Sequence, residues 1–354
     1  SYMNFYQLLQ LDPSTLKYKV HNTDDKKKKI KFMLCLSLRA ILIVLFAIFW
    51  ITSLTFLFSK DTSSLALILF CILLNLRFVP FGYKLKQSII GLGFVLFLFW
   101  LAPFIYLIPY ATIQLLFHFS ILLSLFLITG KEPKMGNPAL YSFSYLYLIG
   151  TTQYTSTSQI LHSFFILLFT YILFSIIYYK KFKSLNEDIS FTYIIKEGIN
   201  FNKKSIWFFY YALGISSLLV LGNYLHIDRF MWATFACSSL FSGYDTFKIS
   251  NRAKERIVGV ILGSILSGIL LFVIPTNFLG MLGGVSLGFC ATYQNKTIFN
   301  CIGAITVATL IFGLKTSIFL RILLNILGIV YGLLYHYIFT KILKYLLKRK
   351  KYAL

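Results

Sequence analysis

The stretch Lys254-Glu255-Arg256-Ile257-Val258-Gly259 follows a short apolar run and opens a longer one, and it indicates how the chain is organised. An earlier stretch, Lys84-Leu85-Lys86-Gln87-Ser88-Ile89-Ile90-Gly91, has the same setting. Asn137-Pro138 and Asn300-Cys301 then open later apolar runs, at nearly the same offset from the two stretches. The sequence therefore predicts a duplicated bundle with basic turns, a layout typical of transport proteins.

The composition is that of a membrane protein. Of the 354 residues, 58% are hydrophobic and 13% are charged, and a soluble domain carries roughly twice that charged fraction. Many apolar runs reach or approach the roughly 20 residues that cross a bilayer as a helix. We therefore expect an all-α integral membrane protein without a large soluble domain, in which each span satisfies its own backbone hydrogen bonds.

The apolar runs predict about twelve transmembrane helices, arranged as two parallel six-helix repeats. The segments expected in chain order are a basic cytoplasmic leader (1–32), a first membrane repeat (33–180), a cytoplasmic linker (181–204), a second membrane repeat (205–343) and a basic cytoplasmic tail (344–354). Within the leader, Asp12-Pro13 predicts the start of a short helix, because proline suits the first helical position.

The basic residues are distributed unevenly across this predicted topology. Of the 34 lysines and arginines, 29 fall on one side of the membrane and three on the other, while Arg39 and Arg321 lie within spans. By the positive-inside rule, both termini are cytoplasmic in a plasma membrane. The same asymmetry explains most of the net charge of +23, so no nucleic-acid partner is expected, and the basic face would contact anionic lipid headgroups. The residue usage favours a bacterial source.

Residues Tyr244–Gly263 carry a pattern of a short span, a polar turn, two arginines at 252 and 256, an apolar pair and a glycine-rich span. In this pattern the stretch Tyr211–Gly313 resembles the membrane half of the fusaric acid resistance / aromatic acid exporter (FUSC-like) superfamily. Residues 33–180 are similar to the same unit in a looser form.

In the first repeat, Arg77 and Lys86 stand near the family's basic positions, followed by glycines. That repeat lacks the paired arginines, and the cytosolic domain of larger family members is missing here.

The resemblance implies a membrane transporter that exports small organic anions, including aromatic carboxylates, and members of the family tend to form homo-oligomers. Plant malate channels are similar to the same unit, so an anion channel of this fold is one alternative function. A non-transporting scaffold protein of the cell envelope is another. Neither alternative is an enzyme, and none of the three functions implies a metal or another cofactor.

Six residues are candidates for anion binding: Arg39, Arg77, Arg252, Arg256, Asn300 and Arg321. Arg252 and Arg256 share a helical face, where they would form a cytoplasmic vestibule for anions or anchor the helix to headgroups. An arginine within a span costs roughly 2.5–3.5 kcal/mol on insertion scales, so Arg39 and Arg321 would line an anion path or pair at the headgroups. Asn300 would bind substrate or join helices.

His118 is the most central ionisable residue of its span, where it would relay protons or simply make a structural hydrogen bond. All eleven carboxylates lie outside the predicted span centres, where many ion-coupled carriers place one. Moving one negative charge out of an inside-negative cell releases roughly 2.3 kcal/mol per 100 mV. Potential-driven efflux is therefore the expected mode, with proton coupling as the alternative.

Overall fold

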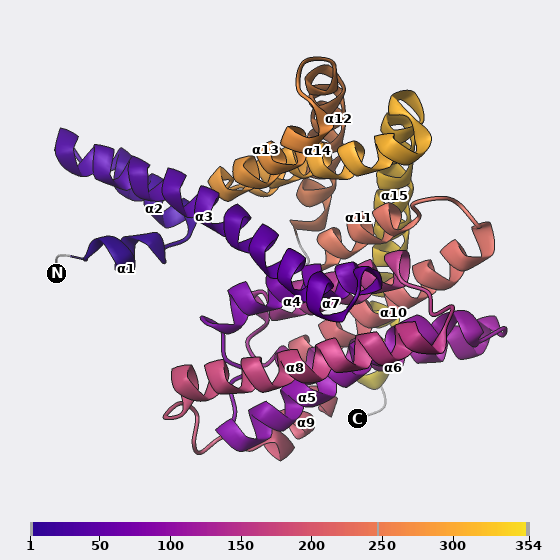
Figure 1. Cartoon of the computed structure of the whole chain (residues 1–354). Helices are drawn as coiled ribbons and strands as arrows, with labels where there is room; N and C mark the ends of the chain where they lie inside the picture. Colours follow the sequence, from indigo (N-terminus) through magenta and orange to yellow (C-terminus); the bar gives the residue numbers. More distant parts are fainter. Residues whose placement is uncertain (1–2, 246–247, 352–354) are drawn as a thin grey trace. The chain divides into compact units, whose positions relative to one another are not determined.

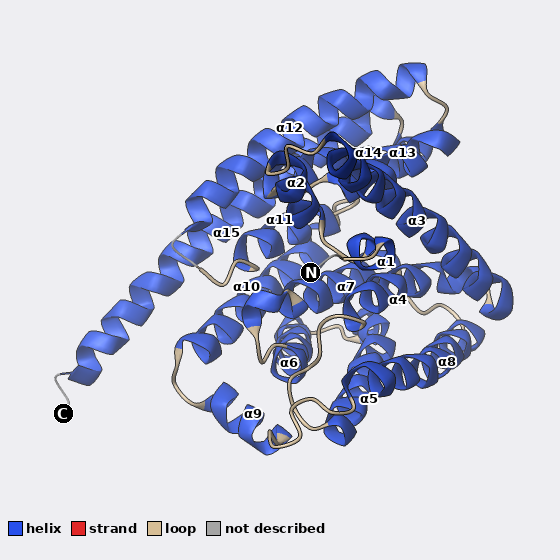
Figure 2. Cartoon of the chain, turned by 90° about the vertical axis from the view of Figure 1, so that its left-hand side faces the viewer, coloured by secondary structure: helices blue, strands red, loops and turns tan. Residues whose placement is uncertain are grey.

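The computed structural model describes residues 3–245 and 248–351, and every regular element in them is helical (Figures 1 and 2). Thr246 and Phe247 of the family-like stretch lie outside the described residues, as do residues 1–2 of the predicted leader and 352–354 of the predicted tail.

Eight of the described helices are long and apolar enough to cross a membrane, which supports the predicted multi-pass membrane protein. They are α3 (Lys26–Phe58), α5 (Leu85–Leu101), α6 (Ala111–Thr129), α8 (Thr157–Phe182), α10 (Lys203–Leu225), α12 (Ile249–Val273), α14 (Tyr293–Phe312) and α15 (Leu314–Lys351). A 3₁₀ segment extends α5 to Leu107.

The predicted arrangement of twelve spans in two repeats is not confirmed. The four remaining predicted spans are α4 (Ser63–Leu76), α7 (Asn137–Thr151), α11 (Met231–Phe241) and α13 (Thr276–Phe289). They contain 11 to 15 residues, whereas a straight crossing needs about 20.

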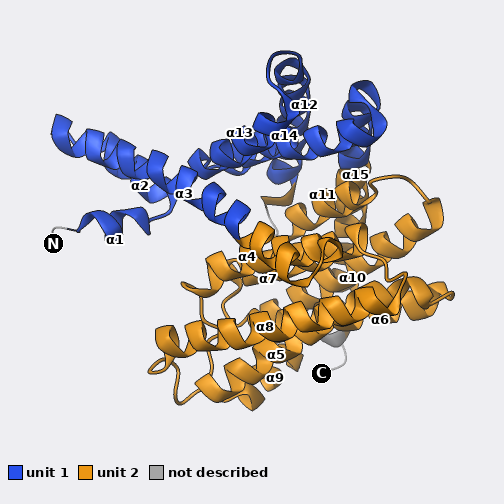
Figure 3. Ribbon diagram, viewed as in Figure 1, with its two compact units in different colours: residues 1–49, 250–326 blue, residues 50–249, 327–354 orange. Residues whose placement is uncertain are grey.

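The chain forms two compact units, and helices α3 and α15 each contribute to both (Figure 3). Unit 1 comprises residues 1–49 and 250–326, and unit 2 comprises residues 50–249 and 327–354. Neither unit coincides with one of the predicted repeats, because unit 1 joins the beginning of the chain to the segment that carries the family-like pattern.

In unit 1, the leader folds into α1 (Phe5–Leu9) and α2 (Pro13–His21). Leu8 and Leu16 are buried together with Cys35 and Leu36 of α3, so apolar burial holds the leader against that helix. Asp12 accepts the Thr15 backbone N–H (3.2 Å) as the α2 N-cap, as the Asp-Pro pair predicts.

Helices α12 and α14 of unit 1 approach closely because α12 presents glycines to its neighbour. A Cβ at Gly263 would lie 2.3 Å from the carbonyl oxygen of Ile298, and one at Gly259 would lie 2.9 Å from the Thr297 Cβ. Small residues at one-turn spacing let helix backbones meet in this way. Gly259 and Gly263 therefore allow α12 and α14 to pack closely, and α13 packs against α14 in the same unit.

In unit 2, α6 packs against α7 and α10, α5 packs against α8, and α7 packs against α4 and α11. Amide side chains join these helices: Asn75 donates to Asn137 Oδ1 (2.6 Å), and Asn137 donates to the Thr129 carbonyl (2.9 Å). These bonds fit the expected role of asparagines as interhelical hydrogen-bonding groups.

The predicted linker contains a helix that the sequence reading did not include, α9 (Phe191–Ile199). Ser190 caps its first turn by accepting the Tyr193 N–H (3.3 Å). Ile194 is buried while Tyr193 and Ile199 are exposed, so α9 presents apolar side chains on two sides. Because lysines flank this segment on both sides, its short amphipathic pattern did not stand out in the sequence as a helix.

Candidate functional site

Helix α12 of unit 1 carries Arg252 and Arg256 one turn apart, and the second of these arginines is buried. Arg256 is 6% exposed, and its Nε donates a 3.0 Å hydrogen bond to Oδ1 of Asn325 in α15. Its immediate partner is thus a neutral amide. Arginine is not deprotonated in proteins, so Arg256 places a positive charge inside this unit.

Asn325 connects Arg256 to a second buried arginine. Its Nδ2 donates a 2.7 Å hydrogen bond to the backbone carbonyl of Arg321, one turn earlier on α15. Arg321 and Asn325 are each 1% exposed. The Arg256 guanidinium interacts electrostatically with both Arg321 and Tyr293, so two like charges lie within mutual range.

Tyr293, the first residue of α14, completes the group. The guanidinium carbon of Arg252 lies 4.3 Å from the centre of its ring, within the range of a cation–π contact. We call Arg252, Arg256, Tyr293, Arg321 and Asn325 the arginine cluster. Three helices of one unit contribute to it, and all three are long enough to span a membrane.

The charge around this cluster is strongly positive. Helices α12, α14 and α15 contain a single carboxylate, Glu255, in their whole length, and Glu255 is exposed. Like charges in a low-dielectric interior repel each other, and an anion between them would relieve that repulsion. Arginine also binds a carboxylate through two parallel hydrogen bonds. The chemistry that this arrangement offers is therefore the binding of a small anion.

The other two candidates of unit 1 are Arg39 and Asn300. Nη1 of Arg39, in α3, lies 3.5 Å from the Gly288 carbonyl oxygen, and the side chain is half-buried. Asn300 is exposed on α14. It was expected to open its span, but α14 begins at Tyr293, so Asn300 lies about two turns inside the helix.

Arg77 and His118 belong to unit 2. Arg77 follows the end of α4, where its Nε donates to the Leu74 carbonyl (3.2 Å) and its guanidinium carbon lies 4.6 Å from the Phe78 ring centre. His118 is 3% exposed, and its Nδ1 lies 2.6 Å from the Tyr145 hydroxyl. This contact fits a structural hydrogen bond, and the relay role of His118 stays a prediction.

The structure thus brings three of the predicted arginines together, Arg252, Arg256 and Arg321. Sequence reasoning missed Asn325 and Tyr293. Asn325 had a usable signal, because it stands four residues after Arg321 in an otherwise apolar run and therefore on the same face. Tyr293 had none, since it is one of 24 tyrosines.

Residues 215–335 match a family described as fusaric acid resistance protein-like. The predicted family is confirmed over this region. The matched region contains all five residues of the arginine cluster. The family match and the eight apolar helices together support a multi-pass membrane transporter. Neither the curated proteins nor the solved structures include a match to the chain.

Proposed function

We propose that this fusaric acid resistance protein-like chain exports small organic anions across the plasma membrane, with its termini on the cytoplasmic side. The observation that carries the proposal is Arg256, a buried guanidinium hydrogen-bonded to the neutral Asn325 in helices long enough to span a bilayer. A positive charge is costly at such a place. Its cost is offset whenever a carboxylate occupies the site.

The anion class follows from the geometry of the cluster. Arg256 and Arg321 supply the charge, and a carboxylate that meets a guanidinium edge-on accepts two hydrogen bonds. Tyr293, whose ring contacts Arg252, supplies an aromatic ring to the same cluster, so an aromatic carboxylate would also gain ring contacts. The proposed substrates are therefore monocarboxylates, with aromatic ones preferred.

The proposed driving force is the membrane potential. The only carboxylate of α12, α14 and α15, Glu255, is exposed, so the cluster offers no buried acid for proton coupling. Export of one negative charge down an inside-negative potential releases roughly 2.3 kcal/mol per 100 mV, which is enough to concentrate an anion outside about fiftyfold per 100 mV.

The test is efflux of benzoate and other carboxylates from proteoliposomes, with potential and pH gradient imposed separately. Arg256→Gln keeps a donor for Asn325 but removes the charge. We expect it to slow efflux roughly 10- to 150-fold, the range of one hydrogen bond to a charged group. Lys254→Gln is the matched control, because Lys254 is exposed on the same helix.

Two results would contradict the proposal. Arg256→Gln could move every tested anion as fast as the parent and Lys254→Gln do, which would leave the cluster without a role in transport. Alternatively, efflux could follow an imposed pH gradient and ignore the potential, which would replace potential-driven export with proton coupling.

A further inference from the structure

Ser264 of α12 has a buried hydroxyl without a hydrogen-bond partner in the described part of the chain. Its side chain is 0% exposed, so the hydroxyl does not reach bulk water. Burying a hydroxyl without a hydrogen bond is unfavourable, and the large majority of buried polar side-chain atoms are bonded. The Ser264 hydroxyl is therefore available to a ligand, and it lies on the same helix as Arg252 and Arg256 of the arginine cluster.

The other buried hydroxyls in the described part of unit 1 all donate to the carbonyl four residues earlier in their own helix. The corresponding acceptor for Ser264 is the Val260 carbonyl, which accepts from Cys301 Sγ (3.9 Å) instead. Ser264 thus differs from every buried serine and threonine around it. The bonded pairs are Ser267 with Gly263 (2.6 Å), Thr297 with Tyr293 (2.8 Å), Thr306 with Ile302 (2.6 Å) and Ser317 with Gly313 (2.7 Å).

Ser264 faces α15. Arg256 donates to Asn325 of α15 (3.0 Å). Further along α12, a Cβ at Gly268 would lie 3.1 Å from Cδ1 of Ile318, which precedes Asn325 in α15, so the two helices run antiparallel. At about 100° per residue, Ser264 lies about 80° around α12 from Arg256, and Gly268 lies about 120° from it. Ser264 therefore points between two directions that both meet α15.

Arg321 lies at the corresponding place on α15. It stands between the two α15 residues that meet α12, just as Ser264 stands between their two counterparts on α12. A helical side chain tilts toward the N-terminus of its own helix, and on α15 this is the direction of Ile318. The Arg321 guanidinium is therefore directed toward the level of Ser264, where a charge and an available hydroxyl come together.

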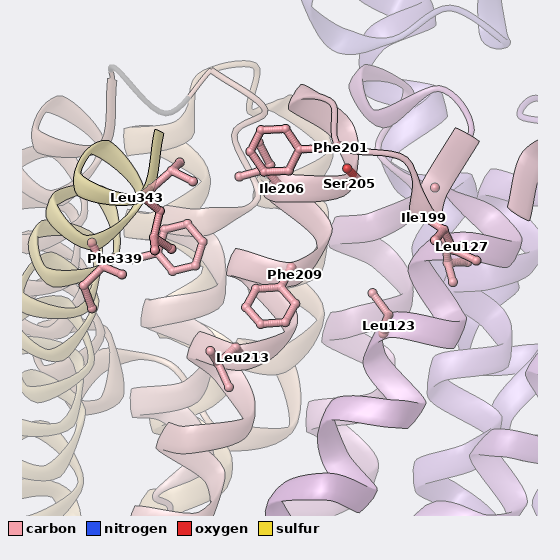
Figure 4. Close-up of a pocket in the computed structure, with 13 residues that line it drawn as sticks. Leu123, Leu127, Ile199, Phe201, Ser205, Ile206, Phe209, Leu213, Phe339 and Leu343 are labelled. Carbon is pink, nitrogen blue, oxygen red and sulfur yellow. The ribbon is translucent and has the colours of Figure 1, made fainter. Parts of the chain in front are cut away.

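The apolar groove of unit 2 offers no such combination (Figure 4). Residues of α6, α10 and α15 line it together with the segment that joins α9 to α10, and Figure 4 shows Phe209 and Leu213 of α10 among them. Ser205 is its single polar side chain, and the Ser205 hydroxyl is already bonded to the Asn202 carbonyl (3.0 Å). An anion would find neither a charge nor an available donor among these side chains.

We propose that the Ser264 hydroxyl is a second contact for the exported anion: it donates a hydrogen bond to a carboxylate oxygen while Arg321 supplies the charge. A carboxylate accepts several hydrogen bonds, and a hydroxyl makes a short, strong one to a charged oxygen. The boundary between α12 and α15 is then the route by which the anion leaves Arg256. This inference rests on the proposed anion export and adds one position to its path.

The test measures benzoate binding to the full chain in detergent by titration calorimetry, and benzoate efflux from proteoliposomes. Ser264→Ala removes the donor, and Ser264→Cys replaces it by a weak donor of similar size. Each should weaken benzoate binding roughly 10- to 150-fold, the range of one hydrogen bond to a charged group, and should raise the half-saturating benzoate concentration of efflux by the same factor.

Ser267→Ala is the matched control. Ser267 is equally buried on the same helix, but its hydroxyl is already bonded to the Gly263 carbonyl. We therefore expect Ser267→Ala to bind and export benzoate as the parent does.

The unfolding temperature separates this role from one in packing. Because the Ser264 hydroxyl makes no hydrogen bond within the described chain, neither variant at this position should lower it. A lower unfolding temperature with unchanged benzoate binding would overturn the inference, as would binding equal to that of Ser267→Ala. The proposed function survives either result if Arg256→Gln still slows efflux. It fails together with this inference if the parent neither binds nor exports carboxylates.

Discussion

Replacing Asn325 by leucine tests whether the amide is what connects the two buried arginines. The substitution removes the acceptor of the Arg256 Nε (3.0 Å) and the donor to the Arg321 carbonyl (2.7 Å). Asn325 is 1% exposed, so water cannot readily replace it. The carbonyl keeps its helical bond, whereas Arg256 loses a partner.

The size of the effect lies between two reference values. Interhelical hydrogen bonds in membranes average about 0.6 kcal/mol, and hydrogen bonds to charged groups contribute about 1.5–3 kcal/mol. Because Arg256 is charged and buried, we expect Asn325→Leu to lower the free energy of unfolding by about 1.5 kcal/mol. In the double variant, which carries Asn325→Leu together with Arg256→Met, most of that loss should be absent, because the leucine then faces an apolar neighbour.

The assay is reversible unfolding in mixed micelles for the parent, the two single variants and the double variant. Asn300→Leu serves as the control, because Asn300 is exposed, and it should change the free energy of unfolding by less than about 0.5 kcal/mol. A coupling energy between positions 256 and 325 below about 0.5 kcal/mol would refute the reasoning, since pairs without contact are additive within that margin.

Two further predictions concern helix packing and the leader. Gly263→Ala should destabilise the protein by about 1–3 kcal/mol, because the new Cβ would meet the Ile298 carbonyl oxygen and overpacking costs that much. Gly303→Ala, where a Cβ would have nothing within 4 Å, should instead stabilise the protein by up to about 1 kcal/mol. Thermal unfolding that ranks the two variants in the opposite order would contradict this. Hydrogen bonds from Ser14 and Thr15 lower the pKa of the Asp12 carboxyl to about 2, whereas its unfolded value is about 3.9. The cap is therefore fully stabilising above about pH 4 and is lost as the pH falls toward 2, so amide exchange in α2 should accelerate over that window, and an Asp12→Asn variant that shows the same acceleration would argue against the carboxylate as its cause.

Much of the fold was predictable because the bilayer leaves few options. Runs such as Ala111–Thr129 and Ile249–Val273 are long and apolar, and the backbone in hydrocarbon must satisfy itself as a helix. The number of full crossings was less predictable. Helices α7 and α11 are apolar but end after 15 and 11 residues, and hydropathy alone does not separate a short helix from a full span. α9 was missed because flanking lysines dominate its composition.

The sequence also predicted part of the candidate site. Arg252 and Arg256 stand out in the sequence because they stand four residues apart in the family-like pattern, and Arg321 stands out because charges are rare in spans. Which arginines meet depends on how α12 and α15 pack, and a neutral side chain, Asn325, connects them. Arg77 has the same chemistry but lies in the other unit.

The sequence by itself determined that this protein is a helical membrane protein, which family its second half resembles and where its positive charges lie along the chain, because hydropathy and local charge are properties of short segments. The tertiary structure alone decided that Arg256 and Arg321 are buried in one unit and that an apolar groove opens beside α10. Both features depend on contacts between residues far apart in the chain, and the apolar faces in a membrane span are too alike for the sequence to specify which of them pack together.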